Sequence, residues 1–258
     1  MRPPCILALL AGGFAGPAAA ELRICLPAPW TAEEGDAAAE VAVLMASLAP
    51  ALDRFPEIGK ALARLRPEVC LVSPLRGMVG WLDPGPPRIT LRADAPEGLL
   101  RGVLLHELRH LDQFARGFCP DNVLTMREGA RATFALEADA SAVSLAMAWV
   151  LRDAGDTAPW QALAAWPEQA DIAAVFAATL EASGDMAAAA AAAFAQWYEG
   201  PNRRESYYLA ACGDYLDRED IGHLLPGRAR LDREFLDRVC RLPDGLPFPC
   251  AEPAGPLR

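Results

Sequence analysis

The chain contains very little lysine and little histidine, and its net charge is negative. Lys60 is the only lysine and lies outside any G-x-x-x-x-G-K pattern, which excludes the nucleotide chemistry of a P-loop. The 24 basic side chains are outnumbered by 34 acidic ones, for a formal charge of −10, so we expect no nucleic-acid partner. No Cys-x-x-Cys pair is present, which argues against a zinc knuckle or a thioredoxin-like redox pair.

Long apolar segments are also missing beyond the N-terminus. Residues 140–151 are apolar but too short to cross about 30 Å of hydrocarbon. The alanine run at 187–193 is typical of a helix, because alanine is the best helix former. We therefore expect no stable membrane span in the mature chain. With 258 residues, of which 53% are apolar, the chain is long enough to bury a substantial core.

The first 20 residues have the pattern of a secretory signal peptide. Arg2 supplies the positive charge, residues 5–16 form a short apolar run, and small residues permit cleavage after Ala20. Removal of this segment would leave six cysteines, an even number that suits an oxidising compartment. We therefore predict a secreted or periplasmic protein. A bridge between Cys240 and Cys250 would tie down the proline-rich C-terminal tail.

Apolar periodicity and turn residues predict one mostly helical α+β domain over residues 21–258, with a small β-sheet or hairpin. Thr31 to Glu34 has the sequence of a capping box, which predicts a helix from there to about Phe55. Asp94 is the expected N-cap of the helix that ends near Gly117. The predicted strands cover 21–26, 69–72, 78–82 and 88–91, and further helices cover 57–65, 128–152, 159–182, 186–199, 204–216 and 231–241.

The motif His106-Glu107-Leu108-Arg109-His110 carries the chemistry. Residues four apart are neighbours on a helix, so both imidazoles can bind one metal ion. Glu107 can then reach a water on that ion and act as general base. The alternative is two core histidines that flank a glutamate by chance. An arc of about 80° on this helix carries the charged residues of the predicted solvated stripe, which are Arg101, Arg109, Asp112 and Arg116. The two histidines lie roughly 100–140° from the centre of that arc, so we expect them to face inward.

A catalytic zinc ion usually takes three protein ligands and leaves its fourth position to water. Glu137 is the first candidate for the third ligand, because an unpaired carboxylate in a small, apolar helical stretch is costly. Glu128 is the alternative third ligand, although a carboxylate at the start of a helix also interacts favourably with the helix dipole without any metal. Asp139 and His223 follow as further candidates.

Other polar residues are candidates for supporting roles. Asp139 and Gln113 can orient a histidine ligand through hydrogen bonds, since a neutral amide such as Gln113 binds zinc poorly. An oxyanion needs a donor from elsewhere in the chain, and the candidates are Tyr207, Tyr208 and His223.

Residues 88–145 resemble the zincin metallopeptidases, and among them the glutamate-liganded gluzincins. The likeness consists of a short strand, His106-Glu107-x-x-His110, and a helix with Glu137-Ala138-Asp139. Through Gln113, the pattern H-E-x-x-H-x-x-Q also resembles small exported metallopeptidases. The resemblance implies Zn²⁺ on His106, His110 and Glu137, Glu107 as base, and a strand at 88–91 beside which a peptide pairs. The chain departs from the gluzincin pattern at Ser141, where many members carry aspartate.

These features predict an exported zinc-dependent metallopeptidase that hydrolyses peptide bonds of a peptide or protein substrate. A metal-activated water would attack, with Glu107 as general base. The alternative is a non-catalytic, metal-holding binding or assembly protein on a degenerate peptidase scaffold. A third interpretation is a helical domain without a metal. The acidic charge of the chain suggests basic substrates.

Overall fold

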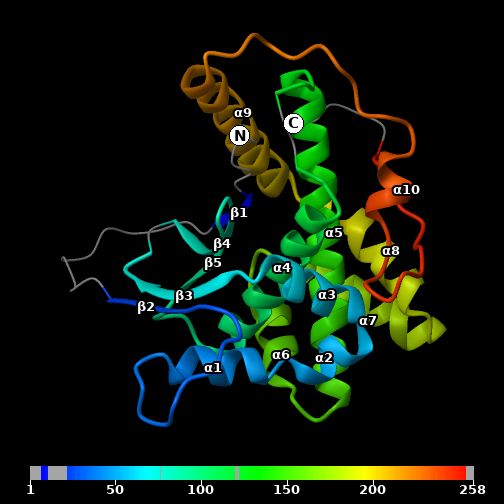
Figure 1. Cartoon of the computed structure of the whole chain (residues 1–258). Helices are drawn as coiled ribbons and strands as arrows, with labels where there is room; N and C mark the ends of the chain where they lie inside the picture. Colours follow the sequence, from blue (N-terminus) through cyan, green and yellow to red (C-terminus); the bar gives the residue numbers. More distant parts are fainter. Residues whose placement is uncertain (1–6, 11–21, 76, 120–121, 254–258) are drawn as a thin grey trace.

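The computed structural model describes residues 7–10, 22–75, 77–119 and 122–253. These residues form a mostly α-helical structure with a small mixed sheet on one side (Figure 1). The strands are β1 (Leu7–Leu10), β2 (Leu22–Leu26), β3 (Glu68–Ser73), β4 (Met78–Pro84) and β5 (Pro87–Arg92). The helices are α1 (Ala39–Ala46), α2 (Ala49–Arg54), α3 (Pro56–Leu65), α4 (Glu97–Ala115), α5 (Met126–Asp153), α6 (Ala158–Ala165), α7 (Ala170–Ser183), α8 (Met186–Trp197), α9 (Pro201–Gly222) and α10 (Phe235–Val239).

The sheet has the strand order β1-β4-β5-β3-β2. β3 and β5 run parallel, whereas the other neighbouring strands pair antiparallel. The strands predicted between residues 69 and 91 are therefore confirmed. β5 lies between β4 and β3, so both of its edges are already paired. The expectation that a peptide pairs beside residues 88–91 is wrong, because a strand in the interior of a sheet has no free backbone groups to offer.

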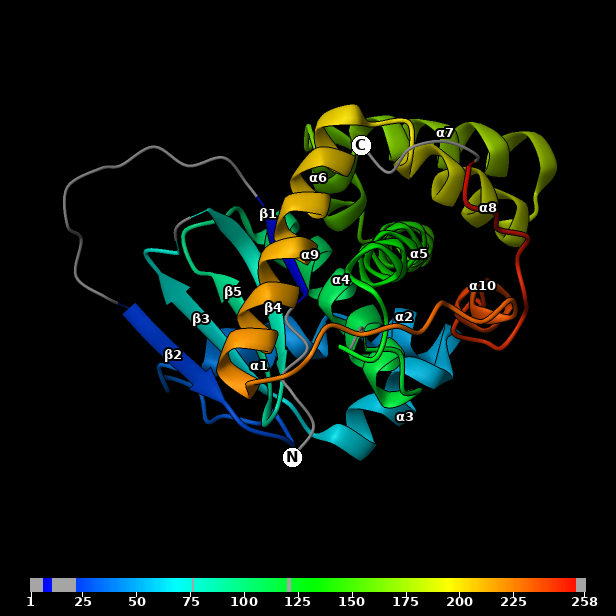
Figure 2. The same ribbon diagram turned by 90° about the horizontal axis from the view of Figure 1, so that it is seen from above.

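Helix α4 lies between the sheet and the long helix α5, and α3 and α6 also pack against it (Figure 2). A glycine in β4 permits the close approach to the sheet: a Cβ atom at Gly80 would lie only 2.5 Å from Cγ1 of Val103 in α4. Gly102 on α4 has the same function toward α6, where Leu163 occupies the space. These contacts bury α4 on all sides.

The burial of α4 contradicts the predicted solvated stripe at three of its four residues, whereas Arg116, which follows the last residue of the helix, is exposed as expected. Arg101, Arg109 and Asp112 are only 9%, 0% and 3% exposed. Their charges are satisfied inside the protein, because Arg101 pairs with Asp156 and Arg109 pairs with Asp112 and Asp139. Amphipathic periodicity assigns every charge to solvent, and so it misplaces charged residues that have buried partners.

Two predicted helix starts are also wrong. Residues 31–38 form turns and irregular structure instead of a helix, and Gly35 has a φ of +93°, a left-handed conformation that a helix cannot contain. The helix expected from Thr31 begins only at Ala39 and is interrupted at Ser47 and Leu48. Asp94 is not an N-cap, because α4 begins at Glu97 after Pro96.

The other predicted helices differ mainly in their ends. Those at 57–65, 128–152 and 186–199 are confirmed as α3, α5 and α8. The segment 159–182 forms two helices, because the chain turns at Trp166 and Pro167 between α6 and α7. α9 extends beyond the predicted 204–216, and α10 is shorter than the predicted 231–241.

Two disulfides join described residues. Cys25–Cys70 links the paired strands β2 and β3, and Cys240–Cys250 closes the C-terminal segment as predicted. Most of the predicted signal peptide and its cleavage site lie outside the described residues, although residues 7–10 form β1 on the edge of β4. Among the described helices, only α5 is long and apolar enough to cross a membrane, and 94% of its apolar window is buried, as in a core helix.

The close approach of α4 to β4 predicts a position-specific effect of adding one methyl group. Gly80→Ala would push Val103 away from the sheet and destabilise the protein by about 1–3 kcal/mol. Gly59→Ala is the control, because a Cβ there meets nothing within 4 Å and alanine favours the helix α3. Urea unfolding measures both variants. Equal urea midpoints for Gly80→Ala and Gly59→Ala would show that α4 does not depend on a glycine at position 80 for its approach to the sheet.

Candidate metal centre

The side chains of His106, His110 and Glu137 converge between α4 and α5. The two Nε2 atoms lie 2.9 Å apart, Nε2 of His106 is 3.3 Å from Oε2 of Glu137, and Nε2 of His110 is 3.4 Å from Oε1. The histidines stand one turn apart on α4, while Glu137 comes from the middle of α5. Three potential metal ligands thus meet within 4.8 Å of one another.

The cluster is deeply buried, and its polar atoms are incompletely paired. His106, His110 and Glu137 are each 1% exposed, and the neighbouring Glu107 is fully buried. Among the described residues, no well-oriented hydrogen bond reaches either oxygen of Glu107, either oxygen of Glu137, or Nδ1 of His106. A buried carboxylate without well-oriented hydrogen bonds is expensive, so these atoms indicate that the protein alone does not complete the site.

Burial and mutual charge shift the pKa values of all four groups. Burial raises the pKa of Glu107 to about 8 and lowers that of His106. For Glu137, the two histidines outweigh the effect of burial and lower the pKa to about 2. For His110, the Glu137 carboxylate outweighs burial and raises the pKa to about 9. The protein alone therefore favours a protonated His110 against a charged Glu137, which is a charge arrangement that a bound cation can replace.

The ligand set and its spacing fit a zinc ion. Ligand atoms about 2.1 Å from a tetrahedral zinc ion lie about 3.4 Å from one another, and the three contacts here measure 2.9, 3.3 and 3.4 Å. Two imidazoles and one carboxylate are also a donor set found in catalytic zinc sites. His106, His110 and Glu137 are therefore the residues that would hold the ion.

A chain of hydrogen bonds orients His110. Nδ1 of His110 lies 2.8 Å from Oε1 of Gln113. The amide nitrogen of Gln113 donates to Oδ2 of Asp139 and to the carbonyl of Leu136, which turns the amide oxygen toward the histidine. Nδ1 must then carry a proton, so Nε2 is the nitrogen that presents a lone pair to the cluster when the imidazole is neutral.

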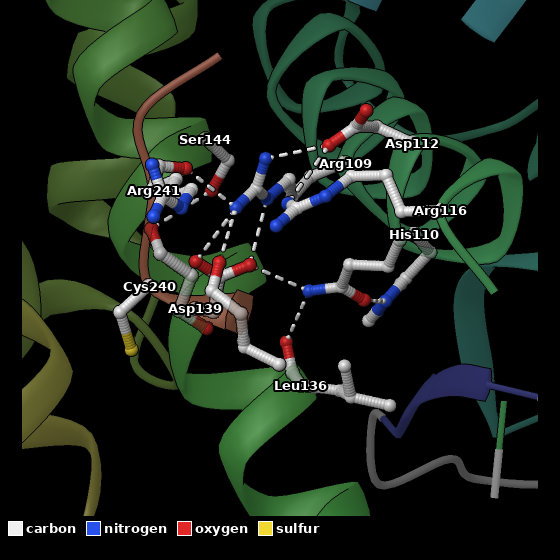
Figure 3. Close-up of polar contacts among 12 residues, drawn as sticks. Arg109, His110, Asp112, Arg116, Leu136, Asp139, Ser144, Cys240 and Arg241 are labelled. Carbon is white, nitrogen blue, oxygen red and sulfur yellow. Dashed lines mark hydrogen bonds and ion pairs between the residues drawn. The ribbon is translucent and has the colours of Figure 1, made fainter. Parts of the chain in front are cut away.

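Arg109 anchors this chain and lies between Asp112 of α4 and Asp139 of α5 (Figure 3). Its guanidinium forms two hydrogen bonds with Asp139, at 2.7 and 2.9 Å, and a third with Asp112 at 2.6 Å. It also donates to the carbonyls of Val239 and Arg241, on either side of Cys240. One buried cation thereby joins α4, α5 and the C-terminal segment.

The other candidate residues lie in different surroundings. The phenol of Tyr207, on α9, is beside Glu137; burial and that carboxylate raise its pKa well above the ordinary value. Tyr208 follows on the same helix and packs partly buried against the core. Glu128 is paired with Arg131 and with the backbone N–H of Leu231, in the first turn of α5. His223 is exposed at the end of α9, about 24 Å along the helix axis from Tyr207.

Sequence reasoning missed two features of the site. The periodicity places Arg109 in solvent, and its spacing from Asp112 is the one sequence signal of a buried partner. The carbonyls that Arg109 binds lie some 130 residues further along the chain, so no local pattern marks them. The backbone of Leu82 in β4 lies beside Glu107 and offsets part of the rise in its pKa. No motif marks such a contact, which depends on how the helix packs on the sheet.

The fold and the site define a mostly helical protein with a two-histidine, one-carboxylate cluster beside a buried glutamate. The chain belongs to the family described as "Putative metallopeptidase family (DUF6782)", which matches residues 17–250. Neither the curated proteins nor the solved structures include a match to this chain.

The buried position of Arg109 predicts a large loss of stability on its removal. Arg109→Met would leave the carboxylates of Asp139 and Asp112 buried without their cation, at a cost of about 3–5 kcal/mol. Arg238→Met is the control, since Arg238 pairs with Asp232 at the exposed surface and should contribute less than about 1 kcal/mol. Chemical unfolding measures both variants. A similar loss in the two would show that the buried network is not what holds these elements together.

Proposed function

We propose that the protein is an exported zinc-dependent metallopeptidase of the zincin type. The observation that carries the proposal is the convergence of His106, His110 and Glu137 on one point, with the unpaired carboxylate of Glu107 beside them. The membership of the chain in a family described as metallopeptidases supports the same reaction class. His106, His110 and Glu137 are the proposed ligands, and Glu107 is the proposed base.

A zinc ion held by His106, His110 and Glu137 would keep one positive charge, which would acidify a bound water and polarise a carbonyl group. The residues of the chain carry the remaining steps. Glu107 accepts the proton of the attacking water at a carboxylate oxygen and passes it to the leaving amine. The burial that raises its pKa suits this role, because it strengthens the carboxylate as a base.

Tyr207 is the proposed donor to the oxyanion. It is the candidate donor that lies beside the cluster, since its phenol adjoins Glu137. A tyrosine is protonated at neutral pH and can donate its O–H to an oxygen on which negative charge develops. Gln113 and Asp139 would act by holding His110 in the tautomer that presents Nε2.

Export and a peptide substrate belong to the same proposal. Disulfides Cys25–Cys70 and Cys240–Cys250 suit an oxidising compartment. Removal of residues 1–20 with a signal peptide would take β1 away and free the edge of β4. The backbone of β4 lies beside Glu107, so an extended peptide that paired with this edge would run past the proposed base.

A non-catalytic metal-holding protein is the second candidate. The burial of the site favours it, because His106, Glu107, His110 and Glu137 are all 1% exposed or less. A catalytic site needs a path for substrate, whereas a structural metal site is closed.

Metal content tests the proposed ligands. The protein purified without a histidine tag should contain about one zinc per chain by elemental analysis, and His110→Ala and Glu137→Ala should lose it. Glu128→Gln is the control and should keep the metal, because Arg131 and Leu231 already engage that carboxylate. A zinc-free parent, or a Glu137→Ala variant that keeps its zinc, would refute the ligand set.

Turnover separates the two candidate functions. Glu107→Gln should keep zinc but cleave a peptide library at least about 100-fold more slowly, because the amide cannot accept the proton. Glu97→Gln removes an exposed carboxylate from the same helix and should leave the rate unchanged. Full activity in Glu107→Gln would exclude the proposed base. A zinc-loaded parent without activity on any peptide would favour the metal-holding protein.

A further inference from the structure

A cavity of about 610 Å³ opens beside the metal centre, within the usual range for ligand pockets. Its walls come from α5, α9 with the residue before it, the end of α8, the first turn of α7 with the segment that precedes it, and Gly77 just before β4. The residues that define its chemistry are Ser141, Glu168, Gln169, Asp171, Arg203 and Tyr207.

Two of the lining residues carry buried hydrogen-bond acceptors without partners among the described residues. Gln169 is 3% exposed; its amide nitrogen donates to Oγ of Ser141, which leaves its buried oxygen Oε1 with no hydrogen-bond partner among the described residues. Oε2 of Glu168 is also buried and lacks a partner there. Both oxygens are buried behind the cavity surface, so a donor of an occupant would reach them only after the amide or carboxylate turns toward the cavity.

The charge of the cavity favours a cationic occupant. Arg203 is the only cationic side chain among the described residues that line it. All five N–H groups of Arg203 are engaged, with both oxygens of Asp171 and with the carbonyls of Glu168, Gln196 and Trp197. Arg203 therefore balances Asp171 and has no donor left for an anion, while no cation among the described residues forms an ion pair with the Glu168 carboxylate.

The cavity also adjoins the proposed reaction site. Ser141 follows Glu137 by four residues and lies one turn along the same face of α5. Tyr207 lines the cavity and places its phenol beside Glu137. A group in the cavity is therefore separated from Glu137 only by the turn of α5 between Glu137 and Ser141 and by the side chain of Tyr207.

We propose that this cavity binds a lysine or arginine side chain of the peptide substrate, close to the bond that is cleaved. The inference rests on the proposed peptidase function for the identity of the occupant. The guanidinium or ammonium group would lie against Glu168, which would supply the opposite charge, and the amide of Gln169 would turn so that its oxygen accepts from the bound group.

Binding without turnover tests the proposal. Nα-acetylarginine amide and its neutral isostere Nα-acetylcitrulline amide are titrated calorimetrically into the zinc-loaded Glu107→Gln protein. The arginine compound should bind at least tenfold more tightly, because only its side chain carries a charge. Glu168→Gln in the same background should reduce this ratio to below about threefold, whereas Glu181→Gln, an exposed carboxylate on α7, should leave the ratio unchanged.

Equal affinity for the two compounds, or an unchanged ratio in a folded Glu168→Gln protein, would overturn the proposal. Cleavage of a peptide library by the parent is measured in parallel. Cleavage without a preference for basic residues would refute the cavity's role and leave the peptidase function intact. Selective binding of the arginine compound without any cleavage would refute the peptidase function and leave the cavity as a site for basic groups.

Discussion

The ion pair between Arg109 and Asp139 is the interaction on which the arrangement of the metal centre depends. Both side chains are fully buried, and each comes from one of the two helices that carry the cluster. The pair sets how α4 and α5 face each other, because a shift along either helix would separate charges that have no water to compensate them. The same carboxylate holds Gln113, which in turn fixes the tautomer of His110.

The interface between α4 and α5 therefore contains two kinds of buried charge. In one group, Arg109 is surrounded by carboxylates and carbonyls that use its donors, and the polar atoms are well paired. In the other, Glu107 and Glu137 face two histidines without well-oriented hydrogen bonds. Natural sequences pair their buried charges, so an unpaired group retained beside a paired one is typical of a functional site. The paired group supplies the rigidity that the unpaired group lacks.

Local patterns predicted the elements that carry the site, and distant contacts decided the rest. The spacing of His106 and His110 requires only a helix, and Glu137 stood out because a charge is costly within a small apolar stretch. Proline, glycine and other turn residues also marked the ends of the strands that precede α4. Arg109 was misplaced because its partners include carbonyls near residue 240. The cavity was also beyond prediction, since its walls include α5, α9, the end of α8 and the segment before α7.

Helix α9 connects the cavity with the metal centre. Arg203, in its first turn, binds Asp171 at the start of α7 and the carbonyls at the end of α8, which fixes where α9 begins. Tyr207 follows four residues later on the same face, so its phenol reaches Glu137 only while that anchor holds. The anchor also forms the cavity wall. A side chain held there would touch the turn of helix that positions Tyr207, and recognition of the substrate and placement of the oxyanion donor would depend on the same few contacts.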